Sequence, residues 1–193
     1  MQHRGCRHAH DAYNAVQGFH DVCAVFLNVL GDTMAKAAAL AVARTHLRYP
    51  YAMSATLDPV MHQMQLLYPL IRSADPELAR FLAESDTPVY FALSWMISWF
   101  SHNIPHPARA ARLYDLFIVS NPLMPLYVAA QLVIAHRDEL LAGECEFTVV
   151  HHRLSNPRME LLTDQLLEAA VQLYRRCPLK RIQQEARHYL DTA

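Results

Sequence analysis

The sequence predicts an all-α protein of many helices, and three observations support that prediction. The chain has 193 residues and is 53% hydrophobic, which is enough for one substantial core and favours a single domain. Only 4 of its residues are glycine, and this favours helices because glycine loosens a helix whereas alanine and leucine lose little entropy in one. Apolar residues also recur at intervals of three and four along most of the chain.

The balance of charge and the length of the apolar runs argue against nucleic acid and membranes as partners. The 17 basic and 18 acidic residues nearly balance, so no strong field exists to attract nucleic acid or an anionic membrane. The longest apolar runs, 91–97 and 123–134, fall short of the roughly 20 residues that span a bilayer, and we expect no transmembrane helix. The basic amino terminus is not followed by an apolar run, unlike a signal peptide. We therefore expect a cytoplasmic protein that does not bind nucleic acid.

Cysteine and histidine residues do not form a strong metal-binding pattern. The 4 cysteines lie far apart without a CxxC pair, which is typical of reduced thiols rather than of a disulfide framework or a zinc ribbon. Cys6, His8 and His10 are close in sequence, but segment 1–12 has nothing apolar to hold them in place, and we predict a poorly ordered arm there. No metal or other cofactor is expected.

In the first half of the chain, capping residues, glycine and proline predict where helices begin and end. An amphipathic helix is expected over 17–30, ended by Gly31-Asp32, and an alanine-rich helix over 33–47. Prolines that follow a capping residue then mark the starts of three helices. These are 58–72, which opens at Asp58-Pro59 and is kinked by Pro69, then 76–84 after Asp75, and 89–102 after Thr87-Pro88.

Helix 89–102 is apolar on nearly every side and is therefore expected in the middle of the core. Trp95 and Trp99 are four residues apart, so they would share one of its faces as core residues. The second half of the chain predicts five further helices, at 108–119, 123–136, 144–154, 159–176 and 180–190.

Four segments resemble, in order and spacing, the motifs of one family. Residues 15–21 read Ala-Val-Gln-Gly-Phe-His-Asp and resemble the Y-x-Q-G motif of the TBC family of Rab GTPase-activating domains. Segments 91–100, 112–117 and 122–127 are similar to the later motifs of that family, in particular of its endoplasmic-reticulum-anchored branch. The resemblance covers 17–178 and implies an all-α TBC-type Rab-GAP domain at 13–178, with an arm at 1–12 and a C-terminal helix at 179–193.

The resemblance also implies a mechanism and a partner. In the family, an arginine and a glutamine enter the nucleotide site of a GTP-bound Rab GTPase, and Gln17 matches the glutamine. Gly18, His20 and Asp21 follow it as supporting residues. Arg112 and Asp115 would border the Rab surface and, three residues apart, could pair across one helical turn. The chain would thus activate a partner enzyme in vesicle trafficking, at the cytosolic face of the endoplasmic reticulum or Golgi, rather than act on a substrate of its own.

Three departures from the family pattern lower the expected activity. Ala15 stands where the family has an aromatic residue, and Tyr13 lies two positions too early. Only 16 residues precede Gln17, and neither Arg4 nor Arg7 stands in an I-x-x-D-x-x-R motif, so we expect the amino-terminal part of the domain and its arginine to be missing. The membrane anchor of the subfamily is also not found before the last residue.

Two other functions fit parts of the sequence. The first is a non-catalytic helical scaffold that keeps the Rab-binding surface without the chemistry. The second is a metal-dependent phosphohydrolase of the HD type, in which histidine and aspartate residues converge on a metal. That hypothesis depends on His10-Asp11, His20-Asp21 and the pair His151-His152.

Overall fold

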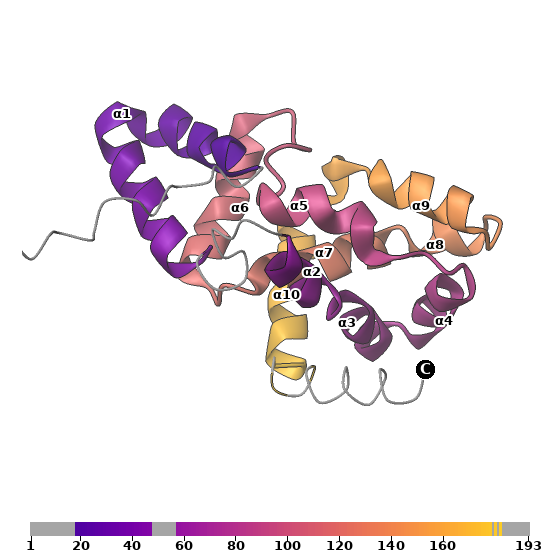
Figure 1. The fold of residues 1–193 in the computed structure, drawn as a ribbon. Helices are drawn as coiled ribbons and strands as arrows, with labels where there is room; N and C mark the ends of the chain where they lie inside the picture. Colours follow the sequence, from indigo (N-terminus) through magenta and orange to yellow (C-terminus); the bar gives the residue numbers. More distant parts are fainter. Residues whose placement is uncertain (1–17, 48–56, 179, 181, 183–193) are drawn as a thin grey trace, which may run out of the picture.

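The structure is a computed structural model, and it describes residues 18–47, 57–178, 180 and 182. This part of the chain contains helices and no strand, which confirms the predicted all-α class. Figure 1 shows the helices gathered in one body, with α1 at one side. In chain order the helices are α1 (Phe19–Thr45), α2 (Asp58–Met64), α3 (Leu67–Ala74), α4 (Pro76–Glu84), η1 (Val89–Ala92), α5 (Leu93–Ile97), α6 (Pro107–Val119), α7 (Met124–Ala135), α8 (Arg137–Leu141), α9 (Phe147–Ser155), η2 (Met159–Leu161) and α10 (Asp164–Arg176).

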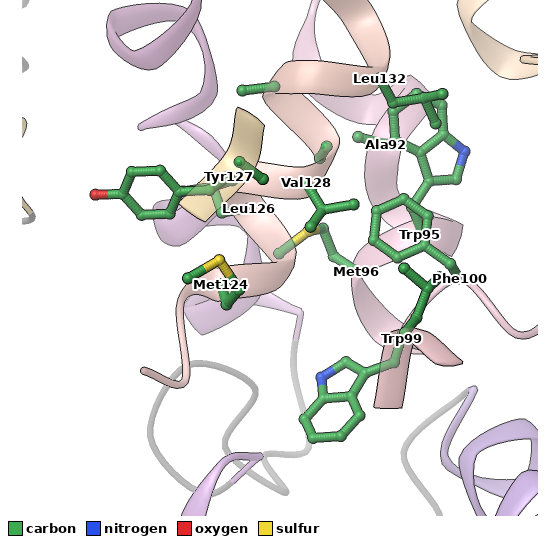
Figure 2. Packing of buried hydrophobic residues seen from close by; sticks show 14 of the residues in the cluster. Ala92, Trp95, Met96, Trp99, Phe100, Met124, Leu126, Tyr127, Val128 and Leu132 are labelled. Carbon is green, nitrogen blue, oxygen red and sulfur yellow. The ribbon is translucent and has the colours of Figure 1, made fainter. Parts of the chain in front are cut away.

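Helix α7 lies at the centre of the fold, packed between α3 and α10 and touching α5, α6 and α8 (Figure 1). It is apolar all round, as a helix surrounded by other helices must be, and Val128, Ala129 and Leu132 have no exposed surface. Figure 2 shows side chains of α7 meeting those of segment 92–100 in one apolar layer. The predicted helices 108–119, 123–136 and 144–154 are confirmed as α6, α7 and α9.

Helix α1 packs against α6 and is bent in the middle (Figure 1). The bend lies at Gly31, whose φ of 71° and ψ of 171° are not helical, so the predicted break is confirmed as a kink within one continuous element. Because the two halves are joined, α1 is the one helix among the described residues that is long and apolar enough by length and composition to cross a membrane, contrary to our expectation from the interrupted runs. Less than a quarter of its most apolar stretch is buried.

The single helix predicted over 58–72 is wrong, because the structure has two helices there. α2 ends at Met64 and α3 begins at Leu67. Proline lacks an N–H, and its ring crowds the carbonyl four residues earlier. For Pro69 that carbonyl belongs to Gln65, so the break comes before the proline rather than after it. Asp58 is the first helical residue rather than the cap, whereas Asp75 does cap α4, with its Oδ1 accepting a hydrogen bond from the Leu78 amide at 3.0 Å.

The helix predicted over 89–102 is also shorter than expected. A 3₁₀ turn precedes α5, which ends at Ile97, and Trp99 and Phe100 then take left-handed φ values of 50° and 66°. The Phe100 amide bonds back to the Trp95 carbonyl at 2.8 Å, which closes the helix end with an aromatic residue where glycine is usual. Trp95 and Trp99 are both fully buried, so their core role is confirmed, but they do not share one helix.

Two further differences concern the last third of the chain. The predicted helix 159–176 is a 3₁₀ turn followed by α10, which begins after Thr163, whose hydroxyl oxygen accepts from the Leu166 amide at 3.3 Å. Helix α8, between α7 and α9, was not predicted. Three of the predicted thiols, Cys23, Cys145 and Cys177, are free, as expected. Segment 1–12 and almost all of 180–190 lie outside the described residues.

Candidate functional site

Helix α1 starts at Gly18, whose conformation and surroundings both require glycine. Its φ is +94°, in the left-handed region that other residues rarely adopt. Its carbonyl oxygen accepts hydrogen bonds from the amides of Asp21 at 3.1 Å and Val22 at 3.4 Å. A Cβ atom at Gly18 would lie 2.9 Å from both the carbonyl oxygen and Cγ1 of Ile97. The start of α1 therefore rests directly on the backbone at the end of α5.

Gln17, the residue predicted to be catalytic, lies outside the described residues. What the structure describes is thus the support immediately after Gln17. The same holds for Ala15, Tyr13, Arg4 and Arg7, which also lie outside the described part of the chain.

Asp21 lies in the first turn of α1 and contacts two histidines. Its Oδ1 is 3.3 Å from Nε2 of His20, and its Oδ2 is 3.3 Å from Nδ1 of His102. The Asp21 side chain is 24% exposed, whereas both imidazoles are mostly exposed. The negative charge is also favourable here, near the positive end of the helix dipole. The structure therefore brings the predicted His20 and Asp21 together and adds His102, which sequence analysis did not identify.

His102 belongs to the turn 98–102, which joins the end of α5 to the loop before α6. The Tyr114 hydroxyl of α6 donates toward the Ser98 carbonyl at 3.1 Å and lies 3.2 Å from Ser101 Oγ. The His102 amide donates to Ser98 Oγ at 3.3 Å. Burial raises the pKa of Tyr114 above its ordinary value; the Ser101 hydrogen bond lowers it and the nearby charge of Asp21 raises it. Helix α6 thus holds the turn that carries His102.

The predicted pairing of Arg112 with Asp115 across one turn of α6 is wrong. The Arg112 guanidinium instead donates from Nε to Oδ1 of Asp164 on α10, at 3.1 Å, because α10 lies beside that face of α6. Arg112, Asp115 and Asp164 line an open groove of about 630 Å³ between the two helices, together with apolar side chains such as Leu116 and Val119. Tyr114, which contacts the turn that carries His102, does not line this groove. Arg112 and Asp115 therefore belong to a different set of contacts from Gly18 and Asp21.

The residues of the phosphohydrolase hypothesis are not brought together in the part of the chain that is described. Asp21 contacts His20 and His102, whereas the His151 ring lies against Phe147 and near Ser155. No three His, Cys, Asp or Glu side chains among the described residues form a group that could hold a metal ion. His10-Asp11 lies outside those residues.

Comparison with known proteins gives one consistent result. Residues 8–141 match the model of the Rab-GTPase-TBC domain family. The chain is 36% identical over 170 residues to TBC1 domain family member 20 of Bos taurus and 35% identical to the Homo sapiens protein of that name. It is 34% identical over 155 residues to GTPase-activating protein gyp10 of Schizosaccharomyces pombe. These alignments cover 88%, 88% and 79% of this chain but only 42%, 42% and 41% of the relatives.

Proposed function

Because this chain belongs to the Rab-GTPase-TBC domain family, we propose that it binds a GTP-loaded Rab-family small GTPase and accelerates GTP hydrolysis by that partner. The yeast relative is named a GTPase-activating protein, which supports the reaction class. The observation that carries the proposal for this chain is the seat of Gly18 on Ile97, directly after Gln17. The backbone conformation of Gly18 and this close contact both require glycine at the position that follows the glutamine in the Y-x-Q-G motif of the family.

Gln17 supplies the amide that orients the attacking water in this proposal. Phosphoryl transfer requires little covalent help from a protein; it requires a positioned nucleophile and stabilisation of the charge on the transferred phosphoryl group. A glutamine amide is donor and acceptor at once, so it can hold a water between itself and the phosphate. A fixed support for the residue matters because orientation is what such a group contributes.

The arginine needed for charge stabilisation is a separate requirement. An arginine finger contributes about 10³ to 10⁵ in rate. Within these 193 residues neither Arg4 nor Arg7 stands in the I-x-x-D-x-x-R motif. We therefore propose that the 193 residues alone bind Rab but accelerate its GTP hydrolysis only weakly. A segment that carries this motif, joined before them, should raise the rate of hydrolysis.

Single-turnover hydrolysis by GTP-loaded Rab proteins tests the proposal. The 193-residue chain and the chain extended by a family segment with I-x-x-D-x-x-R are compared, each with Gln17→Ala and with Gln65→Ala as the matched control. Gln65 is exposed and lies between α2 and α3. We expect acceleration by the extended chain, loss of most of it in Gln17→Ala, and no change in Gln65→Ala. An inert extended chain contradicts the activator proposal.

The same experiment decides between an activator and a scaffold when binding is measured beside turnover. If the extended chain binds GTP-loaded Rab in preference to GDP-loaded Rab yet does not accelerate hydrolysis, the chain is a non-catalytic Rab-binding scaffold. If it neither binds nor accelerates for any Rab, the partner class itself is wrong.

A further inference from the structure

We propose that the groove between α6 and α10 is a docking site for an amphipathic helix of a partner protein, with a lysine or arginine at the edge of its apolar face. The groove has a volume of about 630 Å³, which is within the range of pockets that hold ligands. Side chains of both helices line it. The inference does not depend on GTPase activation, and it is tested without a GTPase.

The groove is long enough for a short helix to lie along it. On α6 it extends from Arg112 to Val119, which is about 10 Å of helix. On α10 it extends from Asp164 to Arg175, which is about 16 Å. These lengths correspond to about two to three helical turns. An amphipathic helix that lays its apolar face into a groove is a common mode of peptide recognition.

Apolar side chains line part of the groove. Leu116 of α6 and Val171 of α10 are partly buried there. Val119 lines it as well and is 82% exposed, the highest value among the exposed large apolar side chains of the described residues. A partner that covers Val119 with its own apolar groups removes this surface from water, which favours binding. An apolar face is therefore one requirement for the occupant.

Two carboxylates of the groove call for a basic group. Arg112 already pairs with Asp164 at 3.1 Å. Asp115 lies three residues after Arg112, and Glu168 lies four residues after Asp164, so each shares a helix face with one member of that pair. Among the described residues, neither Asp115 nor Glu168 has an ion pair or a side-chain hydrogen bond. A lysine or arginine placed between the two walls would neutralise both, whereas a phosphate would be repelled.

Arg175 adds a charge of the opposite sign to the same groove. It lies seven residues beyond Glu168, about two turns along α10, and has no ion-pair partner among the residues that the structure describes. An acidic residue about two turns from the basic residue of the partner would pair with it. Only a polypeptide offers both signs of charge with apolar groups between them, so the occupant is a protein segment rather than nucleic acid or lipid.

Fluorescence anisotropy of a labelled synthetic helix tests the inference on the 193-residue chain. The probe has about 15 residues, mostly alanine, with a lysine and a glutamate about two turns apart and leucines between them on the same face. It is made in both orders of the two charges, so that either direction of docking is sampled. We expect one order to bind with a Kd below about 1 mM.

The matched control peptide has glutamate in place of the lysine. It should bind at least about tenfold more weakly, because like charges then face each other across the groove. The inference is overturned if neither order of the lysine peptide binds, or if the glutamate peptide binds equally well.

Variants of the chain show whether the peptide occupies the groove. Val119→Ser, and the double variant Asp115→Asn with Glu168→Gln, should each raise Kd about three- to tenfold through lost apolar burial or lost charge attraction. All three side chains are exposed, so the fold should be retained. The matched controls are Ile118→Ser and Glu160→Gln, which change exposed side chains outside the groove and should leave Kd unchanged. An unchanged Kd in both groove variants would place the peptide elsewhere and refute the proposal.

A second copy of this chain is the competing occupant. Sedimentation velocity over a range of concentrations measures self-association of the chain without peptide. We expect no dimer that depends on Val119. A dimer that Val119→Ser dissociates would show that the groove binds another copy of the chain, and the assignment to a different partner would then be wrong.

Discussion

Helix α7 at the centre of the molecule and helix α1 at its side differ in how much of their surface is packed. Helix α7 is surrounded by α3, α5, α6, α8 and α10, and its residues 124–130 are all buried. Helix α1 is more than twice as long but packs against α6 on one side. Leu27, Val29 and Met34 of α1 are about half exposed or more. Stability is therefore concentrated around α7, whereas α1 is buried along one face and leaves apolar side chains exposed on the other.

The largest expected difference between α7 and α1 is in the free energy of unfolding that a leucine-to-alanine substitution removes. Leu132 of α7 is fully buried, and Leu132→Ala should lower the free energy of unfolding by about 2 to 5 kcal/mol, because it leaves a cavity. Leu27 of α1 is 49% exposed, and Leu27→Ala should cost less than about 1 kcal/mol. Denaturant titration measures both. Equal costs would show that α1 is packed as tightly as the core and would break the comparison.

Gly18 and Gly31, the two glycines with positive φ at the start and in the middle of α1, allow a second comparison of tight and loose packing. Gly18→Ala introduces an unfavourable φ and a clash with the Ile97 backbone, and should cost at least about 2 kcal/mol. Gly31→Ala meets no atom within 4 Å, but its φ of 71° and ψ of 171° lie in a region nearly restricted to glycine, so it should cost about 1 to 3 kcal/mol from the backbone alone, less than Gly18→Ala. Thermal unfolding with both variants checks the order. A Gly31 variant as damaging as the Gly18 variant would mean that the contact with Ile97 contributes little.

Tyr114 of α6 contacts the turn that carries His102, and it should make the stability of the fold depend on pH in the alkaline range. Its pKa is raised by burial, so the folded state keeps a proton that the unfolded state loses above about pH 10. The contribution of Tyr114 is thus complete below that pH and is lost as pH rises, at about 1.4 kcal/mol per pH unit. Unfolding free energies between pH 9 and 11 should fall less steeply in Tyr114→Phe. Parallel curves for the two proteins would contradict the burial of this hydroxyl.

The smallest effect is expected at the groove between α6 and α10. Arg112 and Asp164 are both more than 60% exposed, so Arg112→Gln should change stability by less than about 1 kcal/mol. Titration with GTP-loaded Rab shows whether Arg112 has the partner-binding role implied by the family resemblance. A large loss of stability would instead place this ion pair among the contacts that hold the fold.

Local signals in the sequence predicted most helices, because caps and periodicity act over a few residues. Asp75-Pro76 and the apolar run of α7 are examples. The errors arose where distant residues decide the backbone. The left-handed Trp99 depends on packing against α6, and no local pattern indicates it. Periodicity likewise continued through the start of α10, where Thr163 forms a cap.

The candidate site was predictable in part for the same reason. The motif resemblance identified Gly18 and Asp21 as neighbours of Gln17, and the structure gives each a physical role. His102 was missed because its contact with Asp21 joins elements far apart in the chain. Arg112 was assigned a partner on its own helix, whereas Asp164 reaches it from α10.

We propose that Gln17 orients the attacking water for a partner Rab. Small GTPases of the Ras type carry a water-positioning glutamine of their own. The most direct measurement is therefore hydrolysis by a GTP-loaded Rab in which that glutamine is replaced by leucine, with the arginine-extended chain as activator. If Gln17 orients the water, stimulation persists with the wild-type chain and is lost with Gln17→Ala. Stimulation that disappears with the leucine Rab, or that survives in Gln17→Ala, would contradict it.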